Sequence, residues 1–232
     1  MKITAIYGTS HQGITVGMAR DLISKLPDAQ VREFFLPRDF DHFCTGCCAC
    51  FAGEAPVCVQ AQSALDPIWA AMADCDVLIL ASPVYVYHVT GAMKAFLDHL
   101  GSHWLVHRPD VSFGKKTAVL LTAAAGSGMK QTLGDLRDSC NWLGVGRVCS
   151  FGARVMALRP GELTDKTRAM LDGAMTRLAA RVQKNAGRGP RIGVRARFFL
   201  SKTFMGGGIA PADHVYWREQ GWMDGRVKPY AK

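Results

Sequence analysis

Four closely spaced cysteines are the most distinctive chemical feature of this sequence. Cys44, Cys47 and Cys50 are each separated by two residues, and Cys58 follows after seven more. Three thiolates at this spacing on a tight loop can face one centre, as in many [4Fe–4S] sites, with a fourth cysteine arriving from nearby chain. His42 lies close enough to keep a zinc site open as an alternative. Free thiols or a disulfide switch are the third alternative.

A loop of small and hydroxyl residues, GTSHQGIT at 8–15, indicates a second kind of chemistry. Small residues leave backbone N–H groups free to point at an anion, and the helix that follows adds its dipole. Ile14 stands where a Walker A loop has lysine, and no GxGxxG pattern is present, so neither a nucleoside triphosphate nor a Rossmann dinucleotide site is indicated. A terminal monophosphate held by Ser10, Thr15 and the intervening amides fits better. The alternative is a plain strand-to-helix turn that binds nothing.

Two further loops fit a flat ring beside that phosphate. In SPVYVYH at 82–88, Pro83 fixes the direction of the backbone. Tyr85 and Tyr87 can each offer an apolar face with a polar tip. The sequence AAAGSG at 123–128 is small and unobstructed, so a planar heterocycle could lie against its backbone amides. Three compatible loops are a more specific signal than any one of them.

Hydrophobic patterning predicts the elements that must position these loops. The expected strands cover 2–8, 31–36, 77–82, 117–122 and 148–156, and the expected helices cover 14–26, 63–73, 91–100, 129–143 and 164–184. Ser63 is expected to cap the second helix. Strands alternating with helices predict an α/β, flavodoxin-like doubly wound sheet of five parallel strands in the order 2-1-3-4-5. In that topology ligands bind beyond the carboxyl ends of the strands, where the three loops fall.

Length and composition describe an ordinary globular chain. Its 232 residues are 49% hydrophobic and 20% charged. A chain of this length buries about 70% of its unfolded surface, so disulfide staples are not required. No apolar run reaches the roughly 18 residues of a transmembrane helix, and the N-terminal stretch lacks the apolar region of a secretory signal. We therefore expect a cytoplasmic protein with no transmembrane segment, whose thiols stay reduced.

The sequences GTSHQGIT, SPVYVYHVTGAMKAFLDH and TAAAGSG together resemble the NADPH-dependent FMN reductase family of flavodoxin-like proteins, over about residues 1–180. The resemblance implies that the first loop binds the FMN phosphate, that 83–85 lies along the isoalloxazine, and that the loop after the fourth strand contacts the polar edge of the ring. The cofactor-binding residues it implies are Ser10, His11, Gly13, Ile14, Thr15, Pro83, Val84, Tyr85, Ala124, Ala125 and Gly126. The first loop is one residue shorter than the commoner Gly-Ser-Pro-Arg-Lys form and carries His11 in place of an arginine.

The cysteine spacing resembles the iron–sulfur flavoprotein branch of the same family. That resemblance implies that Cys44, Cys47, Cys50 and Cys58 hold a [4Fe–4S] cluster that exchanges single electrons with FMN, usually in an oligomer. The other cysteines outside this stretch lie within predicted helices or strands and are expected to be buried and apolar; they are Cys75, Cys140 and Cys149.

The chain is expected to divide into a flavodoxin-like FMN-binding domain at 1–185, with a cysteine-rich insertion at about 37–62, and a C-terminal extension at 186–232. Most of the net charge of +9 lies in the last third of the chain. The basic stretch interleaved with phenylalanines could suggest nucleic acid or anionic lipid, but it carries no recognised nucleic-acid motif. The aromatic, helix-like segment at 211–222 needs burial against the core or a neighbouring subunit.

These features predict an FMN-dependent NAD(P)H oxidoreductase. Hydride from NAD(P)H would reach the flavin, and electrons would pass to an acceptor, with a [4Fe–4S] cluster as one route. The cofactor carries the chemistry, so no catalytic side chain is assigned; His11, Tyr85, Tyr87 and His88 are the polar groups expected near the ring. The expected partners are NAD(P)H, an electron acceptor and further copies of the chain in a homo-oligomer. The alternatives are a non-enzymatic flavodoxin-like electron carrier and a cysteine-based redox sensor.

Overall fold

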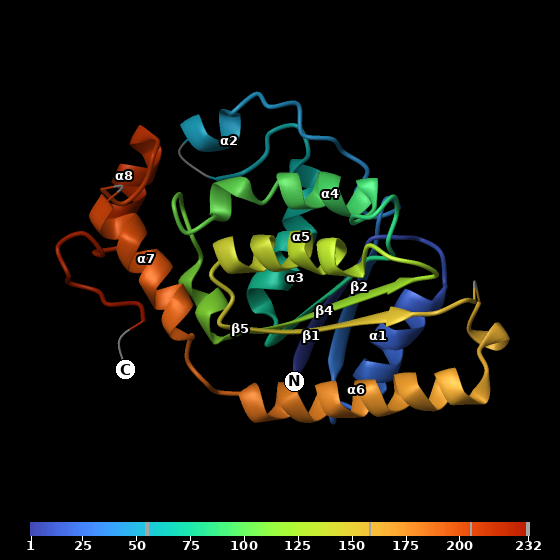
Figure 1. Ribbon diagram of the computed structural model, residues 1–232. Helices are drawn as coiled ribbons and strands as arrows, with labels where there is room; N and C mark the ends of the chain where they lie inside the picture. The colour runs from blue at the N-terminus through green and yellow to red at the C-terminus, as the bar shows by residue number, and fades with distance from the viewer. Residues whose placement is uncertain (54–55, 158, 205, 231–232) are drawn as a thin grey trace.

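Five parallel strands form one sheet in the order β2-β1-β3-β4-β5 (Figure 1). The computed structural model describes residues 1–53, 56–157, 159–204 and 206–230. The strands are β1 (Lys2–Tyr7), β2 (Gln30–Phe35), β3 (Val77–Ala81), β4 (Thr117–Ala124) and β5 (Arg147–Arg154). Their order and direction confirm the predicted flavodoxin-like fold.

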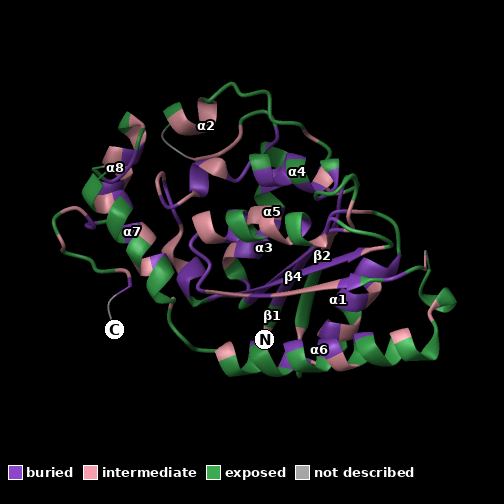
Figure 2. Cartoon of the chain, viewed as in Figure 1, coloured by how far each residue is buried: buried purple, intermediate pink, exposed green. Residues whose placement is uncertain are grey.

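Helices cover both faces of the sheet (Figure 1). On one face lie α1 (Ile14–Ser24) and α6 (Asp165–Asn185), and on the other lie α3 (Gln62–Asp74), α4 (Gly91–Asp98) and α5 (Met129–Trp142). Each face has its own apolar core (Figure 2). The central strand β3 is buried along its whole length, and β1 and β4 are buried except for one terminal residue each. A strand covered on both faces must be apolar along its length, which is why VLILA and TAVLLT read as continuous hydrophobic runs.

The remaining elements are short or lie in the C-terminal extension. They are α2 (Ala49–Ala52), the 3₁₀ turns η1 (Gly101–His103), η2 (Val111–Lys115) and η3 (Pro160–Glu162), and the helices α7 (Ile192–Phe204) and α8 (Pro211–Glu219). The sequence did not predict α7. This helix buries Val194 and Phe198 on one side but leaves Phe199 and Phe204 exposed on the other, so it lacks the one-sided apolar pattern that identifies a helix.

Several predicted boundaries were wrong by one or two residues. The first helix was expected to reach Leu26 but ends at Ser24, because the N–H groups of Lys25 and Leu26 turn to the carbonyls of Leu22 and Ile23 in a tightened last turn and a proline follows at 27. Ser63 was expected to cap the second helix, but α3 starts a residue earlier.

The residue before α3 is Ala61, which offers no side-chain cap, and Ser63 lies inside the first turn. The last predicted strand, 148–156, is observed as β5 at 147–154, and the aromatic segment forms a helix only over 211–219. Such shifts are small on the scale of an element, and every predicted strand and helix of the sheet domain is present.

The aromatic side chains of the C-terminal extension pack on their own chain. Phe198, Trp217, Trp222 and Tyr230 are buried together around Leu105, which belongs to the loop before β4. The ring centroids of Phe198 and Trp217 lie 4.8 Å apart in a stacked arrangement. The sequence left open whether these rings are buried against their own chain or against a neighbouring subunit. Contacts within the chain are sufficient to remove them from water.

None of the helices in the described part of the chain combines the length and the apolar character that a membrane crossing requires.

Candidate functional site

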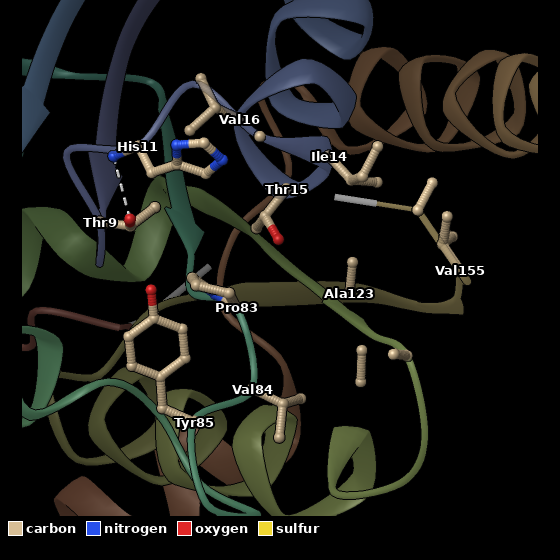
Figure 3. Close-up of a pocket in the computed structure, with 14 residues that line it drawn as sticks. Thr9, His11, Ile14, Thr15, Val16, Pro83, Val84, Tyr85, Ala123 and Val155 are labelled. Atoms are coloured by element: carbon tan, nitrogen blue, oxygen red, sulfur yellow. Dashed lines mark hydrogen bonds between the residues drawn. The ribbon is translucent and has the colours of Figure 1, made fainter. Parts of the chain in front are cut away.

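A cavity of about 220 Å³ opens beyond the carboxyl ends of the strands (Figure 3). The three loops that follow β1, β3 and β4 all border it, together with the segment after β5. Nine of the eleven predicted cofactor residues line it: His11, Gly13, Ile14, Thr15, Pro83, Val84, Tyr85, Ala124 and Ala125. The topology thus brings together segments that are more than 100 residues apart in sequence.

Two predicted residues do not line the cavity. Ser10 is exposed, and its hydroxyl donates a long hydrogen bond of 3.4 Å to the carbonyl of Leu36. Gly126 is also exposed, at the outer part of the third loop. Ser10 and Gly126 were predicted from their positions along the loops. Whether a loop residue lines the cavity also depends on the direction in which the loop turns.

Five lining residues were not among the predicted cofactor residues: Thr9, Val16, Ala123, Val155 and Ala157. Of these, Thr9 and Ala123 lie within the loops that the sequence analysis identified. Val155 and Ala157 directly follow β5. The signal that could have found them is topological, because the carboxyl ends of all parallel strands meet at the same edge of a sheet.

The start of α1 presents unpaired N–H groups to the cavity. Gly13 precedes the helix without any side-chain cap, so the N–H groups of the first turn have no acceptor within the helix. Thr15 is buried there, with 4% of its surface exposed, and its hydroxyl points into the cavity (Figure 3). No aspartate or glutamate is found among the described lining residues. Unpaired donors, the helix dipole and the absence of nearby carboxylates favour an anion.

Hydrogen bonds fasten the first loop to the second. The Thr90 hydroxyl donates to the carbonyl of Gly8 at 2.6 Å, and the Thr90 N–H donates to the Ser82 hydroxyl at 3.1 Å. A Cβ on Gly8 would lie 2.9 Å from both Thr90 Oγ1 and Met93 Cβ, so only glycine fits where β1 ends. The two loops therefore keep a fixed separation across the cavity.

The second loop closes in a tight turn. The N–H groups and carbonyls of Tyr85 and His88 pair with each other at 3.0 and 3.2 Å. Val86 and Tyr87, between them, have φ angles of 46° and 70°, a left-handed conformation that costs roughly 1–3 kcal/mol for a residue other than glycine. The imidazole of His88 lies 2.9 Å from the Asp135 carboxylate of α5.

This turn brings Tyr85 to the rim of the cavity, with 55% of its surface exposed. His11 also borders the cavity, whereas Tyr87 and His88 do not. Of the four polar groups expected near a bound ring, the structure therefore brings two to the site.

The segment between β2 and α3 that carries Cys44, Cys47, Cys50 and Cys58, which we call the cysteine loop, lies beside α4 and does not line this cavity. Cys44 and Cys47 are exposed, Cys50 and Cys58 are half-buried, and all four are free thiols. Burial raises the pKa of Cys50, and the side chains of Cys58 and Cys44 raise it further. The Cys50 thiol is thus within electrostatic range of two other predicted ligands.

Even so, no group of three or more histidine, cysteine, aspartate or glutamate side chains within the described residues has a metal-binding arrangement. The cysteine spacing is present without a preformed site. The prediction for the other cysteines is confirmed, since Cys75, Cys140 and Cys149 are buried.

A buried arginine ties the cysteine loop to the C-terminal extension. The guanidinium of Arg108 donates to the carbonyl of Gly53 at 2.8 Å and to the carbonyl of Cys50. The Asp213 carboxylate lies 3.2 Å from Arg108 Nε and 2.8 Å from His107 Nδ1. Burial by itself would raise the pKa of Asp213, but the hydrogen bonds from His107 and from the Ala210 N–H hold that pKa below its usual value.

Comparison with known proteins agrees with the flavodoxin-like fold. The sequence model of the family described as NADPH-dependent FMN reductase matches residues 1–152. An iron–sulfur flavoprotein of Archaeoglobus fulgidus is 27% identical over 190 residues, which cover 78% of this chain and 80% of that protein.

Solved structures share the fold at lower identity. The apo form of an NADH:FMN oxidoreductase superposes with a TM-score of 0.53 at 22% identity, covering 78% of this chain and 89% of the other. An FMN-dependent NADH-azoreductase of Bacillus anthracis in complex with FMN gives a TM-score of 0.55 at 10% identity, covering 77% of this chain and 100% of the other.

Proposed function

The chain belongs to the NADPH-dependent FMN reductase family and is an NAD(P)H-dependent flavin oxidoreductase, and on that basis we propose that the cavity beyond the strands holds its FMN. The observation that carries this proposal is the start of α1, which has no side-chain cap and places the buried Thr15 hydroxyl at one end of the cavity. Donors of this kind suit a monoester phosphate.

The residues of the cavity fit the rest of the group as well. Ala124 and Ala125 leave room for a flat ring beside the third loop, and the ring of Tyr85 borders the open side. FMN, when bound, supplies a site that accepts hydride and can release electrons in one or two steps. The chain itself binds the phosphate through α1, orients the ring between the two other loops and leaves one side exposed for NAD(P)H.

Two isosteric substitutions test the phosphate site. Thr15→Val removes the hydroxyl in the cavity and keeps the shape of the side chain, whereas Ser10→Ala removes a hydroxyl that donates to the Leu36 carbonyl and does not line the cavity. A hydrogen bond to a charged group is worth about 1.5–3 kcal/mol, so FMN affinity of the Thr15→Val protein should fall roughly 10- to 150-fold. Ser10→Ala should leave it within about twofold. The measurement is quenching of FMN fluorescence during titration of apoprotein, with circular dichroism to verify folding. Unchanged affinity of the Thr15→Val protein would disprove the assignment.

NAD(P)H turnover with an artificial acceptor separates the enzyme from the electron-carrier alternative. The FMN-loaded protein should oxidise NADPH steadily in the presence of ferricyanide, since family membership implies hydride transfer to the flavin. A single flavin reduction without turnover would instead favour a carrier. The same assay with NADH gives the preference between the two nucleotides, which nothing in the cavity lining specifies.

For the cysteine loop we propose a [4Fe–4S] cluster held by Cys44, Cys47, Cys50 and Cys58. Thiolates are the donors such clusters use, and the fixed carbonyls of Cys50 and Gly53 anchor one side of the loop. The relative named as an iron–sulfur flavoprotein supports the proposal. Because the described thiols do not already converge on a metal-binding arrangement, the loop must tighten when it binds the cluster, as metal sites often form only with their metal.

Cys48 supplies a matched control for this cluster, since it lies between two proposed ligands but is not one of them. Protein purified without oxygen should carry about four irons per chain, and so should the Cys48→Ser protein. The Cys47→Ser protein should lose them while keeping its flavin absorption. Iron, zinc and acid-labile sulfide are measured on the same samples. Stoichiometric zinc would assign a zinc site instead, and metal-free protein would leave redox-active thiols.

The homo-oligomeric state, the cytoplasmic location and the division at residue 185 stay predictions from the sequence. The class of electron acceptor that we expect depends on whether the cysteine loop binds an iron–sulfur cluster. An iron–sulfur cluster favours a one-electron carrier, whereas its absence favours a quinone, a nitroaromatic compound or free flavin.

A further inference from the structure

A second cavity, of about 400 Å³, runs along the edge of the sheet. Residues from α5, from the edge strand β5, from the end of α6 and from the segment that leads to α7 line it. Six of its lining residues are cations: Arg137, Arg147, Arg181, Lys184, Arg188 and Arg191. We call this cavity the basic groove. None of its described lining residues is an aspartate or a glutamate.

Two cations of the basic groove donate hydrogen bonds to neutral groups. Arg137 donates to the Ser150 hydroxyl at 2.7 Å, and Arg147 donates to the carbonyl of Gly189 at 3.2 Å. No salt bridge within the described part of the chain involves any of the six. Most guanidinium and ammonium donors of the groove are therefore still available for an anion.

Gathering these charges has a cost that a bound anion would offset. The Nε–H of Arg147 is buried without a hydrogen-bond partner. Burial lowers the pKa of the Arg147 guanidinium, and the positive charges of Arg191 and Arg188 lower it further. Like charges at short range repel unless an opposite charge lies between them, and this repulsion is strongest where water is partly excluded.

The basic groove is separate from the proposed FMN cavity. Both touch β5, but Val155 borders the FMN cavity just after the carboxyl end of the strand, while the groove is lined by 147–150 near its start. Ser150 and Val155 are five residues apart, which corresponds to roughly 16 Å along a strand at about 3.3 Å per residue. A phosphate at the start of α1 therefore does not occupy the groove.

We propose that the basic groove binds an oligophosphate, either the free anion or the phosphate chain of a nucleotide. Guanidinium groups pair with phosphate oxygens through two parallel hydrogen bonds, and several arginines around one concave site can surround a chain of phosphates. A single carboxylate would neutralise only one of the six charges. Duplex nucleic acid would need a surface that reaches along its backbone, whereas these cations line one small concavity.

Neutral variants in α6 and in the segment directly after it provide the test. Arg181→Gln combined with Arg188→Gln removes two cations from the groove. Lys166→Gln combined with Arg177→Gln removes two cations that do not line it, so both proteins lose the same net charge. The FMN-loaded proteins are titrated by calorimetry with tripolyphosphate and, separately, with ATP, at 150 mM salt to screen weak attraction, for which the Debye length is about 8 Å.

We expect the unchanged protein to bind one tripolyphosphate per chain, the groove variant to bind at least tenfold more weakly, and the control variant to stay within twofold. ATP that binds more tightly than tripolyphosphate identifies a nucleotide as the source of the phosphates, and equal affinity identifies the free anion. Both of these results support the groove as a phosphate site.

Three results would overturn the proposal. They are no binding by the unchanged protein, equal weakening in both variants, and binding only to vesicles that contain anionic phospholipid. A raised KM for NADPH in the groove variant alone would support the proposal and identify the cosubstrate as the nucleotide, because NADPH carries a diphosphate. Retention of the flavin absorption in both variants verifies that they are folded.

Discussion

At the scale of single residues, glycine determines how closely the loops of the FMN cavity approach one another. Gly128 precedes α5 with a φ of 96°. A Cβ at this position would lie 2.6 Å from Val84 Cγ1 and 2.8 Å from Tyr87 Cα. The third loop thus rests directly on the strained turn of the second loop, and the position of Tyr85 depends on a residue that has no side chain.

Substitution of this glycine should therefore disturb both folding and flavin binding. Gly128→Ala must adopt a left-handed backbone and push against the second loop, at a cost of about 1–3 kcal/mol. Gly126→Ala, two residues away, meets open space and should change the free energy of unfolding by less than about 0.5 kcal/mol. Urea denaturation and FMN titration measure the two effects. Equal behaviour of the two variants would show that contact between the loops is unimportant.

At the scale of elements, α8 fixes the cysteine loop through one buried ion pair. Asp213 has no exposed surface, and it accepts hydrogen bonds from the N–H groups of Ile209 and Ala210 as well as lying against Arg108. Arg108 in turn holds the carbonyls of Cys50 and Gly53. The C-terminal extension is therefore part of the support for the cysteine loop, and α2 of that loop touches α8.

Asp213→Asn tests this support. It removes the negative charge that lies beside the buried guanidinium of Arg108 and should cost about 3–5 kcal/mol, whereas Asp224→Asn breaks an exposed pair with Arg226 and should cost less than about 1 kcal/mol. The Cys50 thiol should also react faster with a thiol reagent in the Asp213→Asn protein. Unchanged stability and thiol reactivity would show that the ion pair does not support the loop.

The effect of Asp213→Asn should depend on pH in a defined direction. The pKa of Asp213 is below its usual value in the folded chain, so its contribution to the free energy of unfolding is complete above the unfolded pKa of about 3.9 and disappears as the pH falls through the lower, folded value. The difference between the two proteins should therefore be constant near neutral pH and shrink below about pH 4. A difference that stayed constant down to pH 2 would contradict this.

At the scale of the whole molecule, one sheet separates three chemical regions. The proposed FMN cavity lies beyond the carboxyl ends of the strands, the basic groove lies at the start of the edge strand β5, and the cysteine loop lies on the side of α4. The proposed FMN cavity exists only when the strands are assembled, because no single loop forms it. Flavin binding should therefore stabilise the folded chain as a whole.

FMN at 100 times its Kd should raise the free energy of unfolding by about 2.7 kcal/mol. For a chain of this size that corresponds to a rise in Tm of roughly 5–10 °C, at about 2–4 °C per kcal/mol. Riboflavin, which has the ring but no phosphate, should give a smaller shift at the same concentration. Scanning fluorimetry of apoprotein compares the two ligands, and equal shifts would show that the phosphate is not recognised.

The sequence by itself determined the fold and the place of the site. Apolar runs such as VLILA required strands buried on both faces, and their alternation with helices left the order 2-1-3-4-5, because local patterning specifies each element and short right-handed connections restrict its neighbours. The loops of the cavity followed from that topology. The family resemblance then indicated the ligand.

Only the tertiary structure decided what faces what. It left Ser10 and Gly126 out of the cavity lining and brought Val155 to it. Only the structure shows that 192–204 form the helix α7 and that six cations line one groove beside β5. The physical reason is that side-chain direction in loops, and contacts between segments far apart in sequence, depend on the packing of the assembled chain, which no periodicity in the sequence records.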